Sequence, residues 1–267
     1  MEIVKPLKGI DQDIKTVIFD FDGTISTLRQ GWEEVMESLM LDEITGEKAS
    51  AADIKTEIAN YIEESTGIMT IYQMQWLEEK VREYGLNSQK KDKWEYKREY
   101  NKRLLKKVDS RRKKVRNGSC GAEEYLIQGS REFLQELNSL QLQLYLVSGT
   151  DHPDVLEEAE LLGVKKYFTA IKGAPVKGMD SSKEKVLKHL LQEKNLNPGQ
   201  MLIIGDGKVE ISLAAEKGIP ALGMATDEKD GQGIDKWKKD RLIEAGATAI
   251  CGDFTDYRKI REGFNIR

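Results

Sequence analysis

The chain has 267 residues and a formal net charge of −4; 39% of its residues are hydrophobic and 33% are charged. This composition is typical of a globular protein with room for one large domain or two smaller ones. An acidic chain has no overall attraction to nucleic acid or to anionic membranes, which argues against both as partners.

The two cysteines, Cys120 and Cys251, lie far apart and form no C-x-x-C pair, which favours a reducing compartment. No apolar run approaches the roughly 20 residues that a membrane-spanning helix needs. The N-terminal residues contain no apolar segment of the signal-peptide type. We therefore expect a cytoplasmic protein that does not associate with membranes.

The run from Val17 to Phe19 is short, apolar and rich in β-branched residues, which predicts a buried strand. From about Leu28 to Leu126 the apolar residues follow helical spacing and strand signals are few. Four helices are expected there, with apolar faces over 32–40, 54–62, 72–84 and 93–115. An insertion of about a hundred residues is large enough to form a small domain.

Strands and helices alternate from Gly129 onward, a pattern that indicates βα units and a parallel sheet covered on both faces. The sequence therefore predicts an α/β fold, a Rossmann-like, doubly wound, mainly parallel sheet with an inserted all-helical domain. The predicted core comprises residues 1–27 and 127–267, and the insertion comprises 28–126. The expected strands are 144–149, 167–171, 201–206 and 221–225, and the expected helices are 131–140, 152–162, 181–193, 209–217 and 234–245.

Two carboxylates, Asp20 and Asp22, follow the first strand one residue apart. Because side chains alternate along an extended chain, both leave on one side and raise each other's pKa by repulsion. A fold accepts this pair with a cation between the carboxylates or a proton on one of them. Gly23 permits a tight turn and close approach to a ligand, and Thr24 offers a hydroxyl and an N–H. An acidic turn after a strand is the plainer interpretation.

Polar residues also follow two later strands, and in open α/β sheets ligands bind beyond the carboxyl ends of the strands. One strand ends in Ser148-Gly-Thr150, and another in Gly205-Asp206-Gly207 with Glu210 one turn further on. Lys183 opens a helix between these two strands. Each of these residues alone is an ordinary turn or solvated residue. Their combination on one sheet edge predicts phosphoryl chemistry, with a carboxylate nucleophile, Mg²⁺ on the acids, and Ser148 and Lys183 on the phosphate oxygens.

The run Asp20-Phe-Asp-Gly-Thr24 resembles the first motif of the haloacid dehalogenase (HAD) superfamily, and the later motifs follow in the same order. The resemblance implies that Asp20 is the nucleophile and a metal ligand, and that Asp22 is the general acid and then the base, with its backbone carbonyl on Mg²⁺. Ser148 matches the second motif, Lys183 the third, and Gly205 to Glu210 the fourth. It implies metal ligation by Asp20, Asp22, Asp206 and Glu210, and phosphate binding by Gly23, Thr24, Ser148, Gly149 and Lys183.

Two positions depart from a simple match. Glu210 stands where many members have Asp, so its contact with the metal is either direct or through water. Lys172 and Lys177 compete with Lys183 for the third motif, and Lys183 is preferred because it starts a helix before the fourth-motif strand. True dehalogenases of the superfamily lack the second Asp, so Asp22 argues for phosphoryl transfer.

The insertion resembles the superfamily's helical cap of the phosphoglycolate phosphatase and β-phosphoglucomutase type, which closes over the site and carries selectivity. The cap residues expected near substrate are Thr27, Leu28, Arg29, Trp32 and the loop 66–73, which ends at Gln73. Arg29 is expected either to bind a second anionic group of the substrate or to be a solvated or salt-bridged residue. Trp32 is expected in the core in the plainer interpretation, and Gln73 is equally ambiguous.

Residues 90–116 carry fourteen Lys or Arg against four Asp or Glu, a strongly basic segment in an acidic chain. A solvated helix face is the first interpretation, and attraction of an anionic substrate is the second. His152, at a helix start, is expected to be exposed.

These observations predict a Mg²⁺-dependent phosphatase of a small phosphorylated metabolite, such as a sugar phosphate, working through an aspartyl-phosphate at Asp20. One alternative is a phosphomutase of the β-phosphoglucomutase type, in which the cap shields the phosphoenzyme from water. A second alternative is a non-catalytic binding protein on the same scaffold. The expected partner is a small-molecule phosphate ester.

Overall fold

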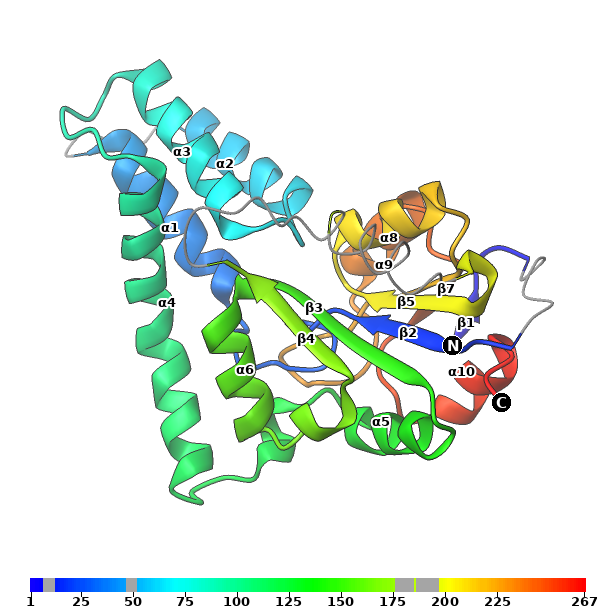
Figure 1. Cartoon of the computed structure of the whole chain (residues 1–267). Coiled ribbons are helices and arrows are strands. Elements are labelled where there is room, and N and C mark those ends of the chain that lie inside the picture. Colours follow the sequence, from blue (N-terminus) through cyan, green and yellow to red (C-terminus); the bar gives the residue numbers. More distant parts are fainter. Residues whose placement is uncertain (7–12, 47–51, 176–184, 186–196) are drawn as a thin grey trace.

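The computed structural model describes residues 1–6, 13–46, 52–175, 185 and 197–267. The strands in these residues form one seven-stranded sheet (Figure 1). In spatial order they are β1 (Glu2–Ile3), β7 (Ala249–Cys251), β6 (Ala221–Met224), β5 (Met201–Gly205), β2 (Thr16–Phe19), β3 (Gln143–Asp151) and β4 (Ala170–Ala174). Neighbouring strands are parallel except β1 and β7, which are antiparallel. The predicted mainly parallel α/β sheet is confirmed.

Strand β2 lies in the middle of the sheet, and Phe19 pairs with Leu146 of β3 on one side and Ile204 of β5 on the other. The chain adds β3 and β4 on one side of β2, and then β5, β6 and β7 on the other. In open α/β sheets such a reversal leaves a crevice at the carboxyl ends of the strands. That crevice lies just beyond Phe19, where Asp20 follows.

Alternate residues of each strand serve the two faces of the sheet. Val17 and Phe19 pack in one hydrophobic cluster with α5 (Ser130–Ser139), α6 (His152–Leu161) and α10 (Tyr257–Gly263). Ile18 packs in a second cluster with α8 (Lys208–Glu216) and α9 (Lys236–Glu244). Helices thus cover both faces, which explains why the strands are almost continuously apolar.

Four helices follow one another between β2 and β3, as predicted: α1 (Trp32–Thr45), α2 (Ala52–Glu64), α3 (Thr70–Tyr84) and α4 (Lys93–Arg116). They pack around a hydrophobic cluster of their own, which includes Met36, Ile58, Leu77 and Val108. Asp92 begins α4 with a capping box, which satisfies backbone donors at the helix start. Figure 1 shows α4 running beside α6, so the insertion meets the sheet domain there. The exact division at residues 28 and 126 stays a prediction.

Some expectations differ from the structure. The strand predicted over 167–171 begins later, at Ala170, because Lys165–Tyr167 form a short 3₁₀ helix. Tyr167 is buried in the hydrophobic cluster that includes α5. A buried aromatic residue in a short apolar run has the same sequence pattern as a buried strand. Strands β1 and β7 and helix α10 were not predicted, and the helix predicted over 181–193 lies almost wholly outside the described residues. Among the helices described, none has the length and apolar character to cross a membrane.

Candidate active site

A cavity of about 710 Å³, open to solvent, lies where β2, β3 and β5 end. Asp20 and Asp22 follow β2, and Asp206 follows β5. Ser148 and Gly149, in the C-terminal half of β3, line the same space. Residues of α1, α3 and α4 and of the loop before α3 form the opposite wall. The structure therefore brings together side chains that the sequence predicted at separate strand ends.

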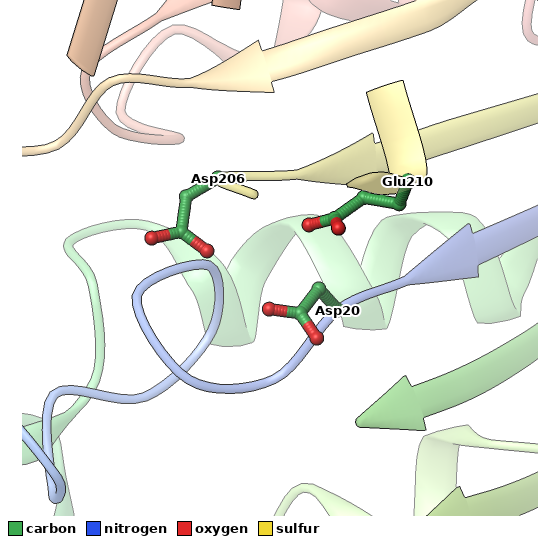
Figure 2. Close-up of side chains that lie close together, drawn as sticks. All are labelled: Asp20, Asp206 and Glu210. Carbon is green, nitrogen blue, oxygen red and sulfur yellow. The ribbon is translucent and has the colours of Figure 1, made fainter. Parts of the chain in front are cut away.

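The carboxylates of Asp20, Asp206 and Glu210 offer ligand atoms that all lie within 4.8 Å of one another. Figure 2 shows the three carboxylates pointing toward a common space from the β2 end, the β5 end and the start of α8. All three residues are buried. Glu210 is oriented by the Gly207 N–H, which donates to Oε1 at 2.7 Å, so the first turn of α8 fixes this carboxylate.

This donor set fits Mg²⁺. Buried carboxylates so close together repel one another, and a cation among them removes that cost. Mg²⁺ takes oxygen ligands, commonly one or two carboxylates together with water and phosphate oxygens. The Asp22 side chain is not in the cluster, and its predicted contact through the backbone carbonyl stays a prediction.

A lysine that the sequence did not single out as a site residue lies beside the cluster. Lys238 of α9 donates to Asp206 Oδ2 at 3.2 Å and also binds Glu228. Burial opposes the charged form of Lys238, but Asp206 and Glu228 together raise its pKa above the ordinary value. The Thr24 hydroxyl approaches the other oxygen of Asp206, at 3.4 Å. Both oxygens of this predicted metal ligand are therefore held by side chains.

The Asp22 carboxylate accepts hydrogen bonds from the hydroxyl groups of two residues of β3. The hydroxyl of Thr150 donates to its Oδ2 at 2.8 Å, and the hydroxyl of Ser148 donates to the same oxygen at 3.2 Å. Its Oδ1 is buried and has no hydrogen-bond donor among the described residues. Burial raises the pKa of Asp22 to about 6, although the nearby Arg29 guanidinium and the two hydroxyls lower it. A carboxyl with such a pKa exists in both protonation states near neutral pH, as general acid–base catalysis requires.

The turn that carries these acids depends on Gly23, whose φ is +77°. A Cβ at this position would overlap the carboxylate of Asp206. The Gly23 N–H donates to the Ser26 carbonyl at 2.9 Å and closes the turn. A side chain at position 23 would therefore both strain the backbone and displace the Asp206 carboxylate.

The loop before α3 lies directly over the site. A Cβ on Gly149 would come within 2.9 Å of the Ile68 carbonyl oxygen, and one on Gly67 within 2.8 Å of Glu210 Oε2. Small residues on both sides thus let the helical insertion approach the strand ends closely.

Arg29 lines the cavity, and its guanidinium is bound by an acid of the sheet domain. Nε and Nη2 donate to the two oxygens of Glu158, at 3.1 and 2.7 Å. Asp154 lies 3.4 Å from Nη2 and Asp22 lies 3.8 Å from Nε. The salt-bridged alternative for Arg29 is the arrangement found, while its contact with a substrate stays a prediction.

The other predicted residues fall in several places. Lys183 and Lys177 lie outside the described residues. Lys172 is exposed on β4 and is not among the residues that line the cavity. Trp32 and Gln73 do line it, and Gln73 donates to the Ser65 hydroxyl at 3.1 Å.

The basic helix α4 pairs with acids on its neighbours. Lys97 binds Asp151, and Arg112 binds Glu158 beside Arg29. Further pairs join Arg103 to Asp42, Lys107 to Glu34 and Arg116 to Glu157. The expected solvated face is thus only part of the surface of α4. The basic residues on its other side form ion pairs with carboxylates of α1, β3 and α6.

Comparison with known proteins places this site in a family. The family model of haloacid dehalogenase-like hydrolases matches residues 14–218. The chain belongs to this family. The match includes the elements that carry Asp20, Ser148, Asp206 and Glu210, whereas Glu228 and Lys238 lie beyond it.

The relatives of this hydrolase span two activities. It is 26% identical over 140 residues to a 5′-nucleotidase of Pseudomonas aeruginosa, covering 52% of this chain and 60% of that protein. It is 27% identical over 126 residues to the phosphoglycolate phosphatase of Escherichia coli K12, covering 46% of this chain and 50% of that protein. The alignments thus span 60% and 50% of the lengths of these two relatives.

The fold has close counterparts among solved structures. A predicted phosphoglycolate phosphatase from Haemophilus somnus 129PT superposes with a TM-score of 0.62 at 18% identity. The superposition covers 94% of this chain and 99% of that one. At this identity the likeness shows a shared fold.

Proposed function

We propose that this hydrolase is a Mg²⁺-dependent phosphatase of a small phosphate monoester, working through a phosphate bound covalently to Asp20. The observation that carries the proposal is the grouping of the Asp20, Asp206 and Glu210 carboxylates within 4.8 Å. Asp20 and Asp206 lie beside Asp22, at the end of a cavity that is open to solvent. Family membership and the names of the relatives support phosphate-ester chemistry.

In the first proposed step, a carboxylate oxygen of Asp20 attacks phosphorus and the bond from phosphorus to the alcohol oxygen breaks. Asp22 gives its proton to that departing oxygen. In the second step, Asp22 takes a proton from water while the water oxygen attacks phosphorus. The bond to Asp20 then breaks, inorganic phosphate leaves, and Asp20 is restored as a carboxylate and Asp22 as the protonated acid.

The protein's own groups suit these roles. Asp22 Oδ1 accepts no hydrogen bond from the described residues, so it is available to a leaving oxygen. Ser148 and Thr150 fix the other oxygen and thereby orient the carboxyl. Mg²⁺ on Asp20, Asp206 and Glu210, when bound, would neutralise charge on the phosphate and on the acids. Phosphate contacts of Gly23, Thr24, Ser148, Gly149 and Lys183 complete the proposal.

The test is Asp20→Asn, with Asp53→Asn as the matched control, since Asp53 is exposed on α2 and makes the same charge change elsewhere. Phosphate release from p-nitrophenyl phosphate is measured with Mg²⁺ and with a chelator. We expect the control to retain wild-type turnover and Asp20→Asn to lose at least about a thousandfold. Mass spectrometry of quenched enzyme should find the phosphate on the peptide that contains Asp20.

Turnover by Asp20→Asn at the wild-type rate, or full activity without a divalent metal, contradicts the proposal. Product analysis with sugar monophosphates separates the phosphomutase alternative, which isomerises the ester without releasing phosphate. Absence of any Asp20-dependent turnover across phosphate esters supports the non-catalytic alternative.

A further inference from the structure

The cavity has a second wall, opposite the strand ends, which the chemistry proposed above does not use. Helix α1 contributes Trp32, α3 contributes Gln73, and α4 contributes Tyr100, Asn101 and Leu104. In a phosphatase of this geometry, the alcohol part of the ester lies between this wall and Asp22. The wall therefore selects the alcohol.

The charged groups around the alcohol position are paired with one another. Beyond the three acids at the phosphate end, Asp151 and Asp154 line the cavity, and Asp151 is paired with Lys97 while Asp154 is paired with Arg29 and Arg112. Of the described residues that line it, Arg29 is the one basic side chain. A second anionic group on the substrate would meet carboxylates and would need Arg29 as its partner.

Arg29 is committed elsewhere. Two hydrogen bonds, of 3.1 and 2.7 Å, tie its guanidinium to Glu158, whose side chain is fully buried. Releasing Arg29 to a substrate would leave the buried Glu158 with less positive charge beside it, an arrangement that proteins avoid. Lys97 of α4 is likewise bound to an acid, Asp151, which lines the cavity.

The remaining groups of the wall suit hydroxyls. The amides of Gln73 and Asn101 and the hydroxyl of Thr70 can both donate and accept hydrogen bonds. The carboxylates of Asp151 and Asp154 accept from a hydroxyl donor, and such charge-assisted bonds are strong. Trp32 and Tyr100 supply apolar surface for the carbon skeleton of the alcohol.

We infer that the substrate's alcohol is neutral and carries several hydroxyl groups, as in a sugar or the ribose of a nucleoside, and lacks a second anionic group. This inference rests on the proposed phosphatase function. It separates the chemistries in the relatives' names, since a nucleoside is neutral and glycolate is a carboxylate.

The first experiment compares glucose 6-phosphate, uridine 5′-monophosphate and phosphoglycolate with Mg²⁺, using p-nitrophenyl phosphate as the reference ester. We expect kcat/KM for the better of the two neutral alcohols to exceed that for phosphoglycolate by at least about tenfold. The sugar and nucleotide arms distinguish the two sources of a neutral alcohol. Equal or better turnover of phosphoglycolate overturns the inference and leaves the phosphatase proposal standing.

Loss of turnover on all four esters would instead count against the proposed function. Binding of the same three metabolites to Asp20→Asn, measured by calorimetry, still tests the inference in that case. Preference for phosphoglycolate in this binding series overturns it, and preference for a neutral alcohol supports it.

A variant provides the second test. Asp154→Asn removes one of the negative charges that would repel a second anion, and Asp53→Asn again serves as the control. We expect Asp154→Asn to raise the ratio of kcat/KM for phosphoglycolate to that for the neutral ester by roughly threefold or more, through KM. An unchanged ratio overturns the charge argument.

Discussion

Two groups of charged side chains face the same cavity, and they are built on opposite rules. At the strand ends, Asp20, Asp206 and Glu210 bring three like charges within 4.8 Å. At the contact of α4 with α6, Arg29 and Arg112 both bind Glu158, so the charges alternate. The second group is complete as it stands, whereas the first, in which Lys238 binds Asp206, still holds three carboxylates together and favours an added cation. The two groups thus differ in how their charges are arranged: like charges lie together in the proposed metal site, and opposite charges alternate at the contact of α4 with α6.

The largest expected effect comes from neutralising Glu158, the acid that both arginines of the second group bind. Glu158→Gln leaves Arg29 and Arg112 buried without the carboxylate that compensates both of them. Removing one partner of a buried ion pair costs about 3–5 kcal/mol, so we expect the free energy of unfolding to fall by that amount. Urea denaturation followed by circular dichroism measures it.

The matched control is Glu157→Gln at the preceding position. Its side chain is 45% exposed, and it pairs with Arg116 at the surface and, at 3.5 Å, with Arg112. An exposed pair contributes about 0–1 kcal/mol, so the control should be close to wild type. Equal losses in the two variants would mean that burial does not decide the strength of these pairs.

The second variant perturbs the like-charged group. Asp206→Asn keeps the shape of the side chain and removes one of three negative charges. We expect Mg²⁺ affinity, measured by calorimetry, to fall by about a hundredfold or more, because outer partners of metal ligands alone are worth about 10–100-fold. Asp154→Asn, an acid of the alternating group, should leave Mg²⁺ affinity nearly unchanged, and a comparable loss there would remove the distinction between the groups.

A third variant uses the backbone. Gly23 and Gly85 both have positive φ, +77° and +59°, but only a Cβ at Gly23 meets another residue, namely Asp206. Gly85→Ala should lose about 1–2 kcal/mol of stability through backbone strain alone. Gly23→Ala should lose at least as much stability and also weaken Mg²⁺ binding by roughly tenfold, because Asp206 must move. Unaltered Mg²⁺ affinity in Gly23→Ala would show that Asp206 is not a ligand.

The strand-end group was predictable because local pattern and topology are enough to define it. Asp20, Ser148 and Asp206 each follow an apolar run, and parallel strands present their carboxyl ends at one edge. Short elements escaped the same reasoning. Strands β1 and β7 have two and three residues, too few to show a period.

The partners of these residues were not predictable, because they depend on how helices pack. Glu158 is 129 residues from Arg29, and Lys238 is 32 residues from Asp206. Lys238 belongs to a run of charges, Asp235 to Arg241, that resembles the outer face of any amphipathic helix. Only the docking of α9 on the sheet shows that two of these charges, Lys238 and Arg241, turn inward to Asp206.

The smallest expected effect comes from an exposed ion pair between the basic helix α4 and its neighbour α1. Arg103 binds Asp42 of α1 at 2.6 Å, but its side chain is 29% exposed and that of Asp42 is 57% exposed. We expect Arg103→Met to lower the free energy of unfolding by less than about 1 kcal/mol, and the difference to shrink further in high salt. Urea denaturation at low and high ionic strength measures both quantities.

Arg103 and Arg112 carry the same charge on the same helix, so the comparison isolates burial. Arg112→Met removes a partner of the buried Glu158, whereas Arg103→Met removes a partner of exposed carboxylates. A salt-independent loss at Arg112 together with a small, salt-sensitive one at Arg103 would assign α4 two roles, a buried joint at its inner face and a solvated surface elsewhere. Equal, salt-sensitive losses would make α4 a uniformly solvated basic helix, as its sequence alone indicates.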